Sequence, residues 1–299
     1  MPEHPLPYAL CFVLSLLYVL KSAAQTEHPT DSSAFAVVQT FDGNEFNGRV
    51  LSQDSSSIVL ETAYFGVVTI RKAVVRSIRP YSARKMVNGK YWFDSPQATR
   101  YFAGSNGYGL QKGEGMYENG WLFFNQITYA FSNQFSMSFG LAPLVVVDGP
   151  FPVWIMPKIT VPVVKDKINV GIGGIYGHTF DPIYDDENGS FGVLFSQLTV
   201  GSRDANGTIG FGYGLSESGW SNAPLFAVSG LVRVGSKGAL ITDNYFFQAD
   251  GEGLAIFTFG ARAIGRRLLF DIGVMLPVVD SESTLIPWLG MHVPFGSPK

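Results

Sequence analysis

Residues 135–141 read FSMSFGL, residues 208–215 read TIGFGYGL, and residues 268–276 read LLFDIGVML. In each segment a large apolar residue occupies every second position, and the positions between hold mostly Ser, Thr, Gly or Asp. This period of two is typical of β-strands, in which successive side chains point to opposite faces. The three segments therefore predict strands that each have one apolar face.

Further segments after residue 120 are compatible with the same pattern, although 191–200 and 239–248 are ambiguous. The clearer ones are 121–131, 155–163, 168–176, 224–234, 252–264 and 285–295. Because bacterial barrels favour even strand numbers, the pattern predicts an all-β chain with an antiparallel transmembrane β-barrel of about 10–12 strands over residues 121–299. Residues 98–103 are a candidate for an extra strand.

A soluble β-sandwich would alternate in the same way, and two features favour the membrane. Glycines on the inner faces leave room in a narrow lumen. Several aromatic residues also lie near strand ends, where membrane barrels carry an interfacial belt. These residues are Tyr129, Trp154, Tyr176, Trp220, Tyr245 and Trp288. We therefore expect outer-membrane lipid to surround the barrel.

Composition agrees with a membrane protein and excludes other classes. The chain is 46% hydrophobic and only 15% charged, whereas about a quarter of the residues of a soluble protein are charged. A net charge of −3 gives no basic footprint for nucleic acid. Beyond the first residues, no apolar run is long enough for a membrane helix, which leaves a closed barrel as the spanning structure.

The first residues predict export. Residues 6–20 read LPYALCFVLSLLYVL, which is too short to span a bilayer, and Ser22 and Ala24 have the spacing of a cleavage site. We therefore expect a signal peptide over 1–24 and a polar linker over 25–33, with a buried N-terminal helix as the alternative. Cys11 is the one cysteine and lies in the signal, so the mature chain would hold no disulfide or thiolate metal site.

Residues 34–80 predict a separate small β domain. Five short strand-like runs lie within it, and Asp42-Gly43 is a strong hairpin-turn signal. The order of these runs and of Gly48 and Gly66 resembles the Sm-like or SH3-like small β-barrel. The RNA binding of Sm proteins does not carry over, because an exported chain meets no RNA. Two hypotheses remain: a periplasmic spacer or docking module, or recognition of a glycan or partner protein.

Residues 81–120 predict a connecting segment rich in aromatic residues and glycine. Within it, Arg100-Tyr101-Phe102, the stretch GLQKGEG at 109–115, Tyr117 and Asn119 resemble a segment of uncharacterised outer-membrane barrel proteins of the Bacteroidota. In that group the segment follows a small Sm-like domain and precedes a barrel, as it does here. The resemblance implies the fold and an outer-membrane location, and it implies no activity.

Polar residues at the alternate positions that face the interior of the barrel form a candidate cluster in the lumen. Its members are Lys158, Arg233, Arg262, Asp271 and His292. One interpretation is a set of ion pairs that satisfy one another, because an unpaired buried charge is costly. The other is a narrow pore or ligand site with a cationic bias.

No catalytic, cofactor or metal site is predicted. The acidic loop 181–187 has oxygen ligands suited to calcium, but its spacing matches no EF-hand and exposed hairpin loops are often acidic. Ser216 and Ser218 could act as nucleophiles only if His178 or His292 came within hydrogen-bond reach. Glu114, between glycines beside Lys112, suggests a turn rather than an anion or metal site.

Three functions follow from these observations. The first is a non-enzymatic outer-membrane protein with a structural role, or one that docks an envelope partner through residues 34–80. The second is a small-solute channel. The third is an outer-membrane enzyme that modifies lipid or peptide.

Overall fold

The computed structural model describes residues 35–81, 86–87, 90–143, 151–180, 188–249, 252–279 and 282–296. The expected signal peptide (1–24), the linker (25–33) and the acidic loop (181–187) lie outside these residues. The chain divides into two compact units, Met1–Phe93 and Asp94–Lys299.

The first unit contains a five-stranded antiparallel sheet in the order β4-β3-β2-β1-β5. The elements are β1 (Phe35–Thr40), β2 (Glu45–Gln53), β3 (Ser57–Thr62), β4 (Gly66–Arg71), the 3₁₀ turn η1 (Lys72–Val74) and β5 (Val75–Tyr81). The two-residue strands β6 (Met86–Val87) and β7 (Lys90–Tyr91) pair separately. Val38, Ile58, Leu60 and Ile70 form the core of the sheet. The expected small five-stranded domain is confirmed.

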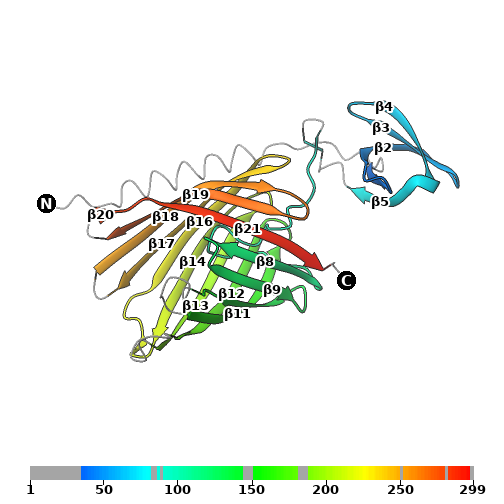
Figure 1. Ribbon diagram of the computed structural model, residues 1–299. Coiled ribbons are helices and arrows are strands. Elements are labelled where there is room, and N and C mark those ends of the chain that lie inside the picture. Colours follow the sequence, from blue (N-terminus) through cyan, green and yellow to red (C-terminus); the bar gives the residue numbers. More distant parts are fainter. Residues whose placement is uncertain are drawn as a thin grey trace. The chain divides into compact units, whose positions relative to one another are not determined.

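The second unit is a closed antiparallel barrel of twelve strands (Figure 1). The strands are β8 (Glu114–Gly120), β9 (Phe124–Ala130), β10 (Phe135–Leu141), β11 (Phe151–Val164), β12 (Ile168–Phe180), β13 (Gly189–Gly201), β14 (Ala205–Ser216), β16 (Leu225–Gly235), β17 (Gly238–Ala249), β18 (Glu252–Ile264), β19 (Leu269–Val279) and β21 (Ile286–Gly296). Each strand pairs with its neighbours along the chain, and β8 pairs with β21 to close the ring. Two short strands, β15 (Gly219–Trp220) and β20 (Glu282–Ser283), pair antiparallel with the ends of β14 and β19. The predicted antiparallel barrel of about 10–12 strands is confirmed.

The first strand of the barrel differs from the expected one. β8 lies inside the segment that was expected to connect the domains. It adds one strand to the eleven segments expected after residue 120 and so brings the number to twelve. Trp121 and Leu122, which were expected to begin a strand, have φ values of +48° and +66°. Such left-handed backbone ends a strand, so these residues form the turn between β8 and β9. Residues 98–103, the candidate for an extra strand, do not form one.

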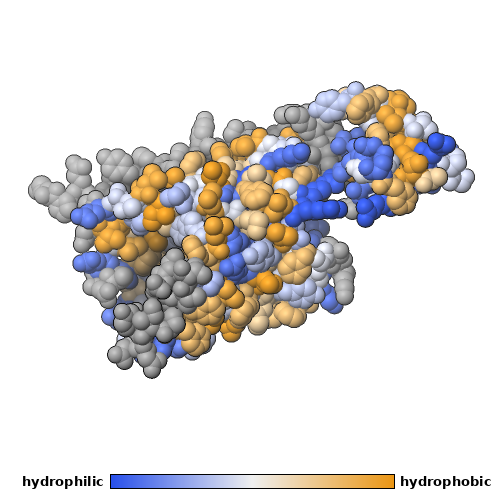
Figure 2. All heavy atoms as spheres, in the orientation of Figure 1, coloured by the Kyte–Doolittle hydropathy of each residue, from blue (hydrophilic) through white to orange (hydrophobic). Residues whose placement is uncertain are grey.

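The outer face of the barrel carries the predicted apolar residues. Phe139, Ile209 and Ile272 are 53%, 64% and 65% exposed, and each lies on the face that the alternation assigned to lipid. Figure 2 shows apolar side chains over much of the visible barrel surface. Exposed apolar area of this extent is stable only against lipid, so the unit is a barrel of the outer-membrane type. Among the described residues, no helix has the length and apolar character needed to cross a membrane.

The two ends of the barrel have different connections. At one end, named the turn end, strands are joined by short connections at 131–134, 165–167, 202–204, 236–237 and 265–268. At the other, the loop end, most connections are longer, including 142–150, 181–188 and 217–224. β8 begins at the turn end and β21 finishes there.

Candidate functional site

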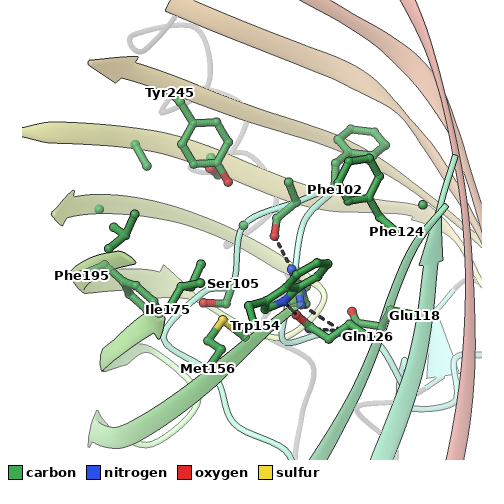
Figure 3. Close-up of a pocket in the computed structure, with 18 of the residues that line it drawn as sticks. Phe102, Ser105, Glu118, Phe124, Gln126, Trp154, Met156, Ile175, Phe195 and Tyr245 are labelled. Atoms are coloured by element: carbon green, nitrogen blue, oxygen red, sulfur yellow. Dashed lines mark hydrogen bonds and ion pairs between the residues drawn. The ribbon is translucent and has the colours of Figure 1, made fainter. Parts of the chain in front are cut away.

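A stretch of chain without regular structure lies inside the barrel. Residues 97–110, named the lumen segment, precede β8, and their side chains Tyr101 and Asn106 are fully buried. A turn closed by a hydrogen bond from Tyr101 N to Gly104 O reverses the chain. Figure 3 shows Phe102 and Ser105 of this segment within the ring of strands. The lumen therefore holds backbone, whose polar groups must find partners on the barrel wall.

Arg262 of β18 supplies the largest set of these partners. Its Nε and Nη2 donate to the two carboxylate oxygens of Asp271 on β19, at 2.7 Å each. Nη1 donates to the carbonyls of Gln97 and Arg100 at 2.7 and 3.0 Å, and Nη2 also donates to Tyr101 O at 2.7 Å. All five N–H groups of the guanidinium are thus used. One buried cation ties two strands to three carbonyls of the lumen segment.

His292 of β21 joins this pair to a second one. Its Nε2 lies 2.9 Å from Asp271 Oδ2, and its Nδ1 lies 3.3 Å from the amide nitrogen of Gln97. Gln97 also donates to Glu118 at 2.7 Å, and Arg100 Nη1 donates to the other Glu118 oxygen at 2.9 Å. The Nδ1 atom also lies 3.6 Å from Glu118 Oε1, so His292 contacts both carboxylates. The carboxylates of Glu118 and Asp271 each have an arginine partner.

Asp243 of β17 and Tyr101 fix the tip of the lumen segment. Asp243 Oδ2 accepts hydrogen bonds from the backbone N–H groups of Ala103 and Gly104 at 2.9 and 2.8 Å. The Tyr101 hydroxyl lies 2.6 Å from both Asn206 and Thr208 of β14. β14 and β17 both pair with β16, so these contacts hold the tip of the segment against one side of the lumen.

The remaining predicted members of the polar cluster lie apart from Arg262, Asp271 and His292. Lys158 of β11 donates to the carbonyls of Asn106 and Tyr108 at 2.5 and 3.1 Å, so it also holds the lumen segment. Arg233 donates to Asp204 at 2.8 Å and to Ser236 O at 2.6 Å, both in connections at the turn end. The structure thus brings three of the five residues into one network.

The other network residues lacked a clear signal in the sequence. Glu118 and Gln97 fall in the stretch that was expected to be a connection, and neither is part of an alternating run. Asp243 lies in the ambiguous segment 239–248, where Thr242, Asp243 and Asn244 are consecutive polar residues. The burial of Thr242, Asp243 and Asn244 could have been suspected only from their position within the long strand β17.

A cavity of about 580 Å³ lies between the lumen segment and the loop end. Its walls are mainly apolar and include Trp154, Phe195 and Trp288, while Arg100 and Ser105 of the lumen segment contribute polar groups. Figure 3 shows Trp154, Met156, Ile175, Phe195 and Tyr245 around this space. Membrane barrels of open channels have polar, water-filled interiors, so an apolar lining is typical of a binding pocket instead.

Three of the aromatic residues assigned to the interfacial belt line this cavity instead. Trp154, Tyr245 and Trp288 point inward, and this part of the prediction is wrong. The reason is strand parity: Trp154 is four residues from the inward Lys158, and Trp288 is four from the inward His292. Tyr129, Tyr176 and Trp220 lie on the exposed face, as a belt requires.

The histidines and serines do not form a hydrolytic triad among the described residues. His292 is committed to Gln97 and Asp271. His178 Nδ1 lies 3.1 Å from Ser190 Oγ, while Glu217, the nearby acid, accepts from the Ser190 backbone N–H. Ser216 and Ser218 hydroxyls lie 2.7 Å apart. The part of the chain that the structure describes contains no group of His, Cys, Asp and Glu suited to a metal ion.

The turn at residues 111–114 is held by its own chain. Gln111 N donates to the Glu114 carboxylate at 2.7 Å, and Gly113 has a φ of +88°. Lys112 N donates to Asn133 at 2.9 Å. These contacts fit the expected tight turn, with the Glu114 side chain serving the turn itself.

Comparisons with known proteins give structural likeness only. No protein-family model and no curated protein matches the chain. Among solved structures, a KdgM porin in complex with disordered oligogalacturonate has a TM-score of 0.45 at 7% identity, over 61% of this chain and 98% of the other. Outer-membrane expressed OmpT of Vibrio cholerae has a TM-score of 0.34 at 11% identity, over 90% and 99%.

Proposed function

We propose that the chain is a non-enzymatic outer-membrane protein whose barrel is closed to free solutes and anchors a docking domain. The observation that carries this proposal is the lumen segment, which Arg262, Asp243 and Lys158 hold from three different strands. A solute channel needs a continuous polar path, and buried side chains such as Tyr101 and Asn106 occupy that path. The barrel then serves as a membrane anchor.

The connections of the barrel support a periplasmic location for the docking domain. Outer-membrane barrels place short turns in the periplasm and longer loops outside the cell. β8 begins at the turn end, so the chain before it would enter from the periplasm after export by the signal peptide at 1–24. The sheet order, with η1 between β4 and β5, supports the expected Sm-like or SH3-like domain.

An exposed apolar group on the small domain supports docking. Tyr64 and Phe65, in the turn between β3 and β4, are 74% and 75% exposed, and Val67 of β4 is 63% exposed. β4 is also an edge strand, with β3 as its one partner in the sheet. Adjacent apolar side chains beside an open strand edge are typical of protein-binding surfaces. The partner that fits is a protein of the cell envelope.

The test is affinity capture of the full chain from solubilised envelopes of its native cell, followed by mass spectrometry. We expect a stoichiometric envelope protein to be captured, and we expect Tyr64→Ser/Phe65→Ser to lose it. Leu51→Ser, which replaces another exposed apolar residue of the same sheet, is the matched control and should retain the partner. Equal capture by both variants would contradict docking through this turn.

A further inference from the structure

The cavity in the barrel has the size and the walls of a ligand site. Its volume of about 580 Å³ falls within the range of about 300–1,000 Å³ that is typical of small-molecule pockets. Trp154, Phe195 and Trp288 from three strands supply aromatic surface, and Phe102 of the lumen segment packs edge-on against Trp288 at 5.6 Å. Water in such a space finds few hydrogen-bond partners, so an apolar molecule gains free energy by displacing it.

The aromatic rings of the wall pack directly against glycines on the neighbouring strands. A Cβ atom added to Gly140 would collide with the Trp154 ring, and one added to Gly173 or Gly177 would collide with Phe195 or Phe191. Trp154 is also anchored by a 3.0 Å hydrogen bond from its Nε1 to Gln126. The pocket is therefore built from side chains with little freedom to collapse into it.

The charges around the cavity are already paired, which selects an uncharged ligand. Arg100 pairs with Glu118 at 2.9 Å, and His292 contacts Asp271 at 2.9 Å. A carboxylate or ammonium group entering the pocket would lose its hydration and find no unpaired counter-ion among the described lining residues. A neutral molecule avoids this cost.

Two adjacent polar groups on the wall select a hydroxyl group on the ligand. Gln197 donates from Nε2 to Ser105 Oγ at 2.8 Å, and both residues line the cavity. Gln197 Oε1 is buried without a hydrogen-bond partner, so it requires a donor. The Ser105 hydroxyl accepts from Gln197 and can donate its own hydrogen to an acceptor. A ligand hydroxyl supplies a donor and an acceptor together, and it satisfies both groups after a small rotation of the Gln197 amide.

We propose that this cavity binds an uncharged lipophilic molecule that carries a hydroxyl group, with the apolar body between Trp154, Phe195 and Trp288 and the hydroxyl at Gln197 and Ser105. This site is independent of docking by the small domain, and it requires only that the lumen segment remain in place.

The test uses the full chain in lipid nanodiscs and three probes of one shape: 6-bromo-2-naphthol, its methyl ether, and 6-bromo-2-naphthoic acid. Bromine quenches tryptophan, so binding beside Trp154 and Trp288 is measured as a saturable loss of emission with one site per chain. We expect the naphthol to bind about tenfold more tightly than the ether, the effect of about one to two hydrogen bonds, and more tightly than the acid. In Ser105→Ala and Gln197→Leu the preference over the ether should disappear.

A matched pair of variants distinguishes binding of the probe in the cavity from its binding in the surrounding membrane. Ala227→Phe places a ring in the cavity and should abolish saturable quenching, whereas Ala261→Phe places the same ring on the lipid face and should preserve it. The proposal is overturned if the wild type shows no saturable quenching, if Ala227→Phe quenches like the wild type, or if the acid binds at least as tightly as the naphthol. Equal affinity for naphthol and ether would overturn the assigned hydroxyl contacts.

Discussion

Arg262 and Asp271 face each other across β18 and β19 and share two hydrogen bonds of 2.7 Å. The side chains of both residues are fully buried, and the other donors of Arg262 hold three carbonyls of the lumen segment. The pair therefore connects the wall of the barrel to the chain inside it.

Arg262→Met removes the cation and leaves Asp271 buried without its counter-ion. Loss of one member of a buried pair costs about 3–5 kcal/mol, so we expect the free energy of unfolding in lipid vesicles to fall by that amount. The double variant Arg262→Met/Asp271→Leu leaves no unpaired charge and should recover part of the loss. A single variant as stable as the wild type would show that the pair does not form.

Asp243→Asn places an amide where a carboxylate accepts two backbone N–H groups and the Ser229 hydroxyl. Hydrogen bonds to a charged acceptor are about twice as strong as those to a neutral one, so the two contacts of the Ala103 and Gly104 N–H groups weaken. We expect faster hydrogen exchange at Ala103 and Gly104, measured by mass spectrometry of the full chain. The control is Thr258→Val, at the buried residue of β18 that pairs with Asp243. It should leave exchange at these amides unchanged.

Gly107→Val tests how closely the lumen segment approaches β12. A Cβ atom at Gly107 would come within 2.5 Å of the Asn169 carbonyl oxygen, so the backbone must shift. Overpacking of this kind costs about 1–3 kcal/mol, and we expect the thermal unfolding midpoint to fall. Gly253→Val, where the added atom meets nothing within 4 Å, should leave the midpoint near that of the wild type.

Tryptophan quenching tests which aromatic residues face lipid. In single-tryptophan variants, brominated phospholipid should quench Trp220, which is 55% exposed on the outer surface, more strongly than Trp154. Strong quenching of Trp154 by the lipid would place its ring outside the barrel and contradict the inward face of β11.

Asp54 makes the turn between β2 and β3 sensitive to acid. Hydrogen bonds from Ser56 and Ser57 lower the pKa of its carboxyl from 3.8 to about 2. Since the folded pKa is depressed, the stabilisation is present above pH 3.8 and is lost as the pH falls through about 2. Asp54→Asn should weaken exchange protection of the Ser56 and Ser57 amides at neutral pH. The difference should shrink as the pH falls through about 2 and vanish only below it.

The sequence allowed the wall of the barrel to be predicted, because alternation is a local property of each strand. Phe139, Ile209 and Ile272 were assigned to the outer face by period alone, and the structure agrees. Parity would also have placed Trp154 and Trp288 inside. Their assignment to an interfacial belt rested on residue type and distance from the strand ends, which is weaker evidence than the face of the strand.

The lumen segment could not be predicted, because its partners are distant in sequence. Tyr101 contacts Asn206, and Gln97 contacts Arg262 and His292, with more than a hundred residues between the partners in each case. The segment has no period of its own, since its backbone groups are satisfied by side chains of the wall and not by a strand ladder. The alternation along the strands identified Arg262, Asp271 and His292 as inward-facing residues. It gave no sign of the backbone segment that they hold.

In the proposed function the lumen segment closes the barrel, and planar-bilayer recording of the purified full chain tests this most directly. We predict no conductance steps for the wild type. Steps should appear in Arg262→Ala/Asp243→Ala, which releases two of the attachments of the segment, and should be absent in Arg233→Ala, whose contacts lie at the turn end. Steady conductance through the wild type, unchanged in the double variant, would contradict a barrel that residues 97–110 keep closed.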